Sequence, residues 1–378
     1  MSTLETNNIA KYNGNNVSMG DALKLKSYTT TQRNALTSVA GDTIYNSTDS
    51  KVQVYNGSSW DDLGGVDAFS MEYLIIAAGG GGNAGYAAAN GGAGGGAGGY
   101  ITNYASESTG GGGTAGGPLY VSKGTALQVS IGAGGAGSTT SLDKGIYGNN
   151  SYFDFVFALG GGAPGNSESP NPQTRGGSGA GGIFAESRTQ GTETAYDSRQ
   201  AGAGTTNQGY RGGYGGHYNN VNRGPSGGGG GAGAVGGDAT IGSPYNGGAG
   251  GAGLSSSITG SSVARAGGGA GGVDAQNTSG TSGSGGTGGG GDAGGGGGTG
   301  NYGNGSAGTT NKGGGGGGAS GVFSTYTGGA GGSGIIILRY ATADVASYSQ
   351  SGLTIASSTS GTDTILQITA GTGTITFS

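Results

Sequence analysis

The sequence contains no cysteine, only 6 prolines and few charges among its 378 residues. The absence of cysteine excludes a disulfide framework and any thiolate chemistry. Charged residues make up 9% of the chain and the net charge is −5, which is less charge than a disordered linker of this length normally carries. The 15 Lys and Arg residues are scattered, so the sequence shows no basic face that would bind nucleic acid.

Long hydrophobic runs are also missing. The longest are residues 73–78 and 335–338, which are too short to cross a bilayer, so no membrane insertion is expected. The first ten residues, MSTLETNNIA, lack the basic and then apolar pattern of a signal peptide. Export through a cleaved N-terminal signal is therefore not expected, whereas release by lysis of the producing cell is compatible with the sequence.

The residues that most enzymes and metal sites need are scarce. His217 is the single histidine, so a Ser-His-Asp triad or a zinc site would depend on it, and no strand-to-helix turn that could carry a nucleophile lies near it. Asp238 and Asp292 follow glycines but lack the periodic repeat of calcium-binding turns, so solvated turn positions are expected for them. We expect no enzyme, no metal site and no cofactor.

Glycine is what the sequence has in excess, with 102 residues. Runs such as 227–231 and 313–318 break the register of one glycine in three that collagen requires. Ordering roughly a hundred glycines costs on the order of 100–200 kcal/mol of backbone entropy, which apolar burial cannot offset here. Polyglycine-II helices, which have three residues per turn and no internal hydrogen bonds, can pair every N–H and C=O with a neighbouring helix.

Such a bundle predicts where alanine is tolerated. A helix surrounded by others has no room for a Cβ, whereas a helix at the edge accepts Ala, Ser or Thr on its outer side. The mixed segments 91–99 (GGAGGGAGG) and 247–253 (GGAGGAG) are therefore expected at the bundle edge. The alternative to a bundle is a flexible tether, which the strands at both ends of the region disfavour.

Apolar runs at 71–78 and 335–340 and apolar alternation at 126–131 and 150–159 predict strands around the glycine runs. In 150–159 the alternation places the side chains of Phe153, Phe155, Phe157 and Leu159 on one face.

Nearer the N-terminus, Thr31 is expected to cap a short helix at 32–36, followed by strands at 43–45 and 51–55. Trp60 is expected to anchor the core of this small module, with the carboxylates of Asp61 and Asp62 facing solvent beside it.

The chain therefore divides by composition into four parts. These are an N-terminal segment at 1–28, a small β module at 29–65, the glycine-rich domain at 66–342 and a C-terminal β module at 343–378.

Tyrosine and arginine gather in the longest interval without a sustained glycine run, residues 166–223. Tyrosine beside Ser, Gly and Asn is typical of binding loops, and Arg with Tyr is enriched at binding hot spots. The candidate binding residues are Tyr196, Arg199, Tyr210, Arg211, Tyr214, His217 and Tyr218. The alternatives are that these side chains cover the glycine helices at the bundle edge, or make a contact between subunits.

Several stretches resemble a known family. Residues 33–63 (RNALTSVAGDTIYNSTDSKVQVYNGSSWDDL) resemble a short module repeated in bacteriophage tail-fibre and structural proteins, and MSTLETNNI is similar to the start of cyanophage fibre proteins. The landmarks EYLIIAAGGGG, ALQVSIGAGGAG, NNSYFDFVFALGGG and GGSGIIILRY are similar to the phage glycine-rich domain. The pattern also resembles phage distal adhesins and the glycine-rich domain of anaplastic lymphoma kinase receptors.

The resemblance implies an all-β fold with a polyglycine-II helix bundle, in which jelly-roll-like β-sandwich strands bracket the glycine-rich insertions. It implies a non-enzymatic fibre or adhesin on the virion surface, attached to other virion proteins through residues 1–28, with loops that bind a host cell-surface glycan or protein. A homotrimer is expected, because small β modules bury too little core alone. The alternatives are a head or tail decoration protein without receptor binding and, more remotely, an ice-binding polyglycine-II protein.

Overall fold

The computed structural model divides the chain into two compact units, Met1–Asp67 and Ala68–Ser378. It describes residues 25–63, 67–85, 91–140, 143–165, 175–183, 201–216, 224–240, 242, 244–273, 280–295, 302–321 and 326–378.

The first unit is a four-stranded sheet with the order β1-β2-β3-β4 and one short helix. Its elements are β1 (Ser27–Tyr28), α1 (Thr30–Asn34), β2 (Thr43–Asn46), β3 (Lys51–Tyr55) and β4 (Trp60–Asp62). The helix begins earlier than the sequence predicted. Thr29 is the N-cap in place of Thr31, because its hydroxyl accepts from the Gln32 N–H while the Gln32 side chain accepts from the Thr29 N–H.

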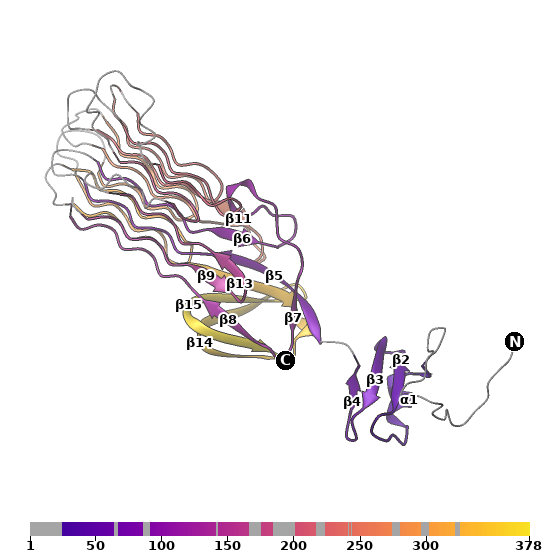
Figure 1. Cartoon of the computed structure of the whole chain (residues 1–378). Coiled ribbons are helices and arrows are strands. Elements are labelled where there is room, and N and C mark those ends of the chain that lie inside the picture. The colour runs from indigo at the N-terminus through magenta and orange to yellow at the C-terminus, as the bar shows by residue number, and fades with distance from the viewer. Residues whose placement is uncertain are drawn as a thin grey trace, which may run out of the picture. The chain divides into compact units, whose positions relative to one another are not determined.

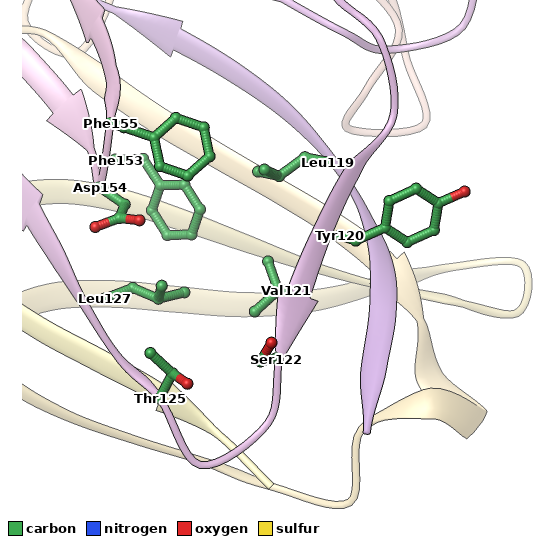
Figure 2. Close-up of a pocket in the computed structure, with 9 residues that line it drawn as sticks. All are labelled: Leu119, Tyr120, Val121, Ser122, Thr125, Leu127, Phe153, Asp154 and Phe155. Carbon is green, nitrogen blue, oxygen red and sulfur yellow. The ribbon is translucent and has the colours of Figure 1, made fainter. Parts of the chain in front are cut away.

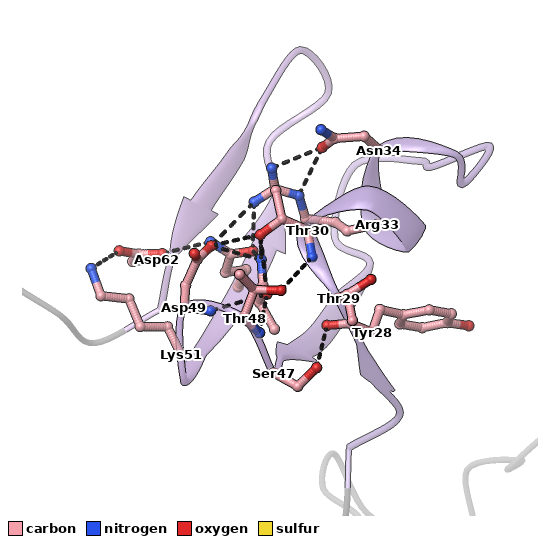
Figure 3. A network of polar contacts seen from close by, with 12 residues as sticks. Tyr28, Thr29, Thr30, Arg33, Asn34, Ser47, Thr48, Asp49, Lys51 and Asp62 are labelled. Atoms are coloured by element: carbon pink, nitrogen blue, oxygen red, sulfur yellow. Dashed lines mark hydrogen bonds and ion pairs between the residues drawn. The ribbon is translucent and has the colours of Figure 1, made fainter.

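The interior of this unit holds Ile44 and two polar side chains and is not built around Trp60. Trp60 is half-buried and packs its ring on Tyr55 at 5.5 Å, whereas Asn46 and Gln53 are buried. The Asn46 amide donates to Gln53 Oε1 at 3.0 Å, and Arg33 Nη1 donates to the same oxygen at 2.9 Å. Figure 3 shows this network, which satisfies the two buried polar side chains of a unit that is too small for a large apolar core.

Asp62 belongs to the same network, although the sequence predicted that it faces solvent. Its carboxylate accepts hydrogen bonds from the Lys51 ammonium and from Gln53 Nε2. The hydrogen bond from Lys51 is the largest cause that lowers the pKa of the Asp62 carboxyl below its usual range. The neighbouring Asp61 is exposed, as expected.

The second unit is built on a nine-stranded sheet, which Figure 1 shows at the base of the glycine-rich segments. Its main path runs β10-β9-β8-β15-β13-β5-β6, with β14 paired to β15 and β7 paired to β5. The strands are β5 (Ala68–Ile76), β6 (Tyr100–Thr102), β7 (Leu119–Ser122), β8 (Ala126–Ser130), β9 (Ser151–Phe153), β10 (Val156–Ala158), β13 (Ile335–Ala341), β14 (Tyr348–Ser360) and β15 (Asp363–Phe377). A separate hairpin pairs β11 (Leu254–Ser256) with β12 (Val263–Arg265). Short 3-10 turns lie at Gly110–Gly112 and Thr342–Asp344. The expected all-β fold with a sandwich-like sheet is confirmed.

The central strands β5 and β13 are buried on both faces. Met71, Tyr73 and Ile75 belong to one apolar cluster, whereas the alternating Leu74 and Ile76 belong to a second. A strand covered on both sides has no polar face, which explains the continuous apolar run that the sequence shows there. Burial in the first cluster raises the pKa of the Tyr340 hydroxyl to about 12.

The C-terminal residues are part of this sheet and not a separate module, contrary to the division at 343–378. Strand β15 pairs with β14 along its length, with β13 through residues 363–368 and with β8 through residues 372–376. Leu366, Ile368 and Phe377 are buried in the same apolar cluster as the β5 residues. A stretch of alternating residues on its own does not show which sheet it joins, so composition suggested a boundary where the fold has none.

Residues 150–159 also differ from the single strand that the alternation predicted. They form a tight hairpin of β9 and β10, with Asp154 in the left-handed region at φ 51°. The chain reversal breaks the common face, so Phe153 is 1% exposed whereas Phe155 and Phe157 are 70% and 49% exposed.

The glycine-rich segments are packed helices with three residues per turn, which we call rods (Figure 1). Five successive N–H groups of one rod each donate to a backbone carbonyl of another segment. Gly79 donates to Gly332, Gly80 to Gly96, Gly81 to Ile146, Gly82 to Gly329 and Asn83 to Ala93. N–H groups that are three residues apart therefore donate to the same neighbouring segment, at carbonyls that are also three residues apart. This is the repeat of a polyglycine-II helix, and the predicted bundle is confirmed.

The rod 91–99 lies in the interior of the bundle. It donates to 159–162, 224–230 and 313–319 and accepts from 77–83, 178–181 and 269–272. Ala93 and Ala97 are fully buried in it, so the prediction of an edge position was wrong for this rod. The methyl group of Ala97 packs in an apolar cluster with side chains from the sheet. It fits there because the rod contacts side chains at this point and not only the backbone of other rods. The prediction was right for 247–253, where Ala249 is exposed.

Candidate binding surfaces

The rods share a distal end, which lies away from the sheet and is closed by polar side chains. Asn83 Nδ2 donates to the Gly165 carbonyl at 2.6 Å, and Ser226 Oγ donates to the Gly91 carbonyl at 2.6 Å. Ser320 Oγ accepts from the Val273 N–H at 3.0 Å. Asn83, Ser226 and Ser320 are all buried, so these short side chains satisfy backbone groups that have no further rod to pair with.

The described residues that flank most non-glycine intervals lie at this distal end. The Gly91 N–H donates to Gly224, the Gly216 N–H donates to Pro225, and Ser282 Oγ contacts both the Gly295 carbonyl and Ser320 Oγ. The intervals that start or finish at these residues are 86–90, 217–223 and 296–301. The candidates Tyr196, Arg199, His217 and Tyr218 fall within such intervals and lie outside the described residues.

Two of the remaining candidates lie together on the outer face of the rod 209–216. The Arg211 guanidinium stacks over the ring of Tyr214, with Cζ 4.5 Å from the ring centroid. They are three residues apart, which is one full turn of a polyglycine-II helix, so they share one face. The spacing that brings Arg and Tyr together is therefore the period of the rod itself.

Asp238 of the neighbouring rod completes this cluster. Its Oδ1 accepts from the Tyr214 N–H at 2.8 Å and lies 3.7 Å from Arg211 Nη1. The Arg211 and Asp238 side chains are 39% and 55% exposed, so the ion pair is open to solvent and contributes little to stability. The cluster offers a ligand a cation, a carboxylate and an aromatic ring.

Tyr210 lies apart from this cluster. Its N–H donates to Gly231 and its carbonyl accepts from Gly179 in the bundle. Its hydroxyl lies next to Gly112, so close that a Cβ at that glycine would be 2.9 Å away. A residue one step along a threefold helix points about 120° away from its neighbour, which separates Tyr210 from Arg211.

The sequence did not predict what the aspartates do. Asp238 and Asp292 are exposed, as expected, but each also replaces a missing carbonyl at the bundle edge. Asp292 Oδ1 accepts from the Gly285 N–H at 2.7 Å, as Asp238 does from Tyr214. Among the described residues, no group of three or more His, Cys, Asp or Glu side chains could hold a metal ion, and no helix is long and apolar enough to cross a membrane.

The fold and these surfaces define a class: all-β proteins in which a sheet carries a bundle of polyglycine-II rods. Comparison with protein families agrees, because the glycine-rich domain family model matches residues 56–341. The chain belongs to this glycine-rich domain family. No curated protein matches its sequence.

Proposed function

We propose that the chain is a structural fibre or adhesin protein of a bacteriophage particle, which attaches to other virion proteins and presents loops to a host cell-surface glycan or protein. The observation that carries this proposal is the common distal end of the rods. The rods fix the chain at both flanks of each interval, so an interval between them can vary without disturbing the fold. The resemblance of residues 33–63 and of the landmark motifs to phage fibre proteins supports the viral setting.

The proposal assigns receptor contact to residues 184–200 and 217–223 together with the Arg211–Tyr214–Asp238 cluster. Broad aromatic faces and guanidinium forks suit both sugars and protein surfaces. It assigns no catalytic step to the chain. Immunogold labelling of purified particles locates the protein on head or tail, and absence of label from intact particles contradicts a virion protein.

Receptor contact is tested by replacing residues 184–200 with a Gly-Ser link. The replacement must stop there, because Gln208 accepts from the Leu159 N–H through its side chain and from the Tyr100 N–H through its carbonyl, so it belongs to the bundle. Particles are expected to assemble normally but to adsorb to host cells at least about tenfold less, as loss of hot-spot contacts predicts. The matched control replaces 166–174, an interval without Arg, Tyr or His, and is expected to adsorb normally.

Normal adsorption after the 184–200 replacement removes this interval as the receptor site. Failed assembly favours the second reading, a structural decoration protein without receptor binding. The substitutions Arg211→Ala and Tyr214→Ala test the described cluster in the same assay without altering an interval.

One observation favours ice binding as a second candidate. The adjacent rods 131–138 and 326–334 hydrogen-bond to each other and expose small uncharged side chains one turn apart, such as Ala133 and Ala136. Ice binding requires a flat, regular, uncharged face of this kind. An ice-recrystallisation assay on the purified chain decides, and unchanged crystal growth at micromolar concentration excludes this candidate.

A further inference from the structure

A cavity of about 210 Å³ opens at the end of the sandwich that lies away from the rods. It is lined by Leu119, Tyr120, Val121, Ser122, Thr125, Leu127, Phe153, Asp154 and Phe155. Figure 2 shows that Leu119 and Val121 of β7 point toward the rings of Phe153 and Phe155, whereas Tyr120 points away. The interior is therefore apolar, and Ser122, Thr125 and Asp154 provide its polar atoms.

The hairpin at the mouth of the cavity keeps a large apolar side chain at the surface. Phe155 is 70% exposed, and it follows Asp154, whose φ of 51° few side chains other than Asn and Asp adopt readily. The Asp154 N–H donates to the Gln128 carbonyl at 2.6 Å, which ties the turn to β8. The turn is thus held in a conformation that displays Phe155 instead of burying it.

The edge of β7 that borders the cavity has no partner strand among the described residues. β7 pairs with β5 along its other edge, and β8, the next strand along the chain, pairs with β15 and β9 instead. Among the described residues the sheet is therefore open along this edge of β7. Backbone groups along a free strand edge are a template for a further strand.

The charge at the mouth is also unbalanced. Asp154 is one of the residues that line the cavity, and its carboxylate makes no hydrogen bond or ion pair with any described residue. A carboxylate beside an apolar surface is complementary to a cation that adjoins an apolar group. Pockets for drug-sized ligands span about 300–1,000 Å³, so a cavity of about 210 Å³ suits a single large side chain better.

We propose that this cavity is a docking site for an extended segment of another polypeptide. The segment pairs its backbone with the free edge of β7, buries one large apolar side chain against Leu119, Val121 and Phe155, and places an adjacent Lys or Arg beside Asp154. Strand addition of this kind combines backbone hydrogen bonds with a pocket for specificity. The site is independent of the receptor surface proposed above, because it lies at the opposite end of the unit.

The test is selection of displayed random heptapeptides on the immobilised full chain. Selected peptides are expected to share a large apolar residue next to Lys or Arg. The substitution Leu119→Trp, which fills the cavity, is expected to weaken their binding at least about tenfold, in line with the loss of one anchor. Asp154→Asn, which tolerates the same left-handed backbone, is expected to weaken it about fivefold at low salt and less at high salt.

The control is Tyr120→Ser, which removes an exposed ring of the same strand that points away from the cavity and is expected to change binding less than twofold. Phe155→Ser replaces Leu119→Trp if the latter unfolds the protein, because an exposed side chain contributes little to folding. Selected peptides that bind Leu119→Trp and the wild type equally overturn the proposal, and so does selection without an apolar–basic pattern or with no enriched peptide.

Discussion

At the scale of single residues, the missing side chain of glycine is what permits the bundle. A Cβ built at Gly229 or at Gly315 would collide with the same backbone oxygen, the carbonyl of Gly95, although the two glycines belong to different rods. Both amides also hydrogen-bond across the bundle, from Gly229 to Gly269 and from Gly315 to Gly267. The rods can approach this closely only where neither carries a side chain.

Gly229→Val and Gly315→Val are therefore expected to destabilise the second unit by about 1–3 kcal/mol or more, because a buried Cβ forces neighbouring rods apart. The matched control is Gly117→Val, since a Cβ at Gly117 would meet nothing within 4 Å. Thermal unfolding measures the difference. Unchanged melting temperatures for both buried variants would contradict the packing of these rods.

Asp62 gives the first unit a dependence on pH. The hydrogen bond from Lys51 lowers the pKa of the folded carboxyl below its ordinary value of 3.8. A depressed folded pKa stabilises the unit above the unfolded pKa, and this stability is lost as the pH falls below 3.8 through the folded pKa. Trp60, the single tryptophan, lies in this unit and reports its unfolding by fluorescence. Asp62→Asn is expected to reduce the loss of stability of the first unit at acid pH. An unchanged dependence of stability on pH would show that the Lys51–Asp62 pair contributes nothing.

At the scale of elements, the strands that bracket the glycine-rich part are one sheet closed by the C-terminal hairpin. β13 pairs directly with β5, and β15 pairs with both β13 and β8, so β15 links the strand near residue 130 to the strands near residues 70 and 340. Phe377 packs edge-on against Phe69 at 5.3 Å and against Tyr340 at 5.6 Å. The hairpin thus contributes to the same core from which the rods extend.

Deletion of residues 343–378 is therefore expected to unfold the second unit and not merely to remove an appendage. It exposes the buried side chains of β5 and β13, and burial of each such side chain contributes about 1.5–3 kcal/mol. Loss of cooperative unfolding by circular dichroism or calorimetry is the expected result. A truncated chain that retains a transition at the wild-type temperature would restore the view of 343–378 as a separate module.

At the scale of the whole molecule, the fold removes part of the argument that predicted a homotrimer. The integration of 343–378 removes one of the two small modules whose size predicted a trimer, and the polar network around Asn46 and Gln53 gives the other an interior of its own. The homotrimer remains a prediction that rests on the resemblance to fibre proteins. Light scattering is expected to give three times the chain mass of 35.5 kDa, and a monomer at micromolar concentration would exclude it.

The sequence by itself determined the type of structure. Glycine runs without a collagen register left paired polyglycine-II helices as the way to satisfy the backbone, and the alternating apolar stretches marked strands that are present. The composition of residues 166–223 also marked Arg211 and Tyr214 as candidates, whereas their stacking on one face of a rod was seen only in the structure.

Only the tertiary structure decided which rods lie next to one another. A glycine has no side chain that could encode its neighbour, and some rods pair with segments more than 200 residues away, as Gly79 does with Gly332. The same holds for the central place of the rod 91–99, for β15 at the middle of the sheet and for the Asp154 turn that splits an apparently continuous strand. These features depend on contacts between distant segments, and local periodicity carries no information about such contacts.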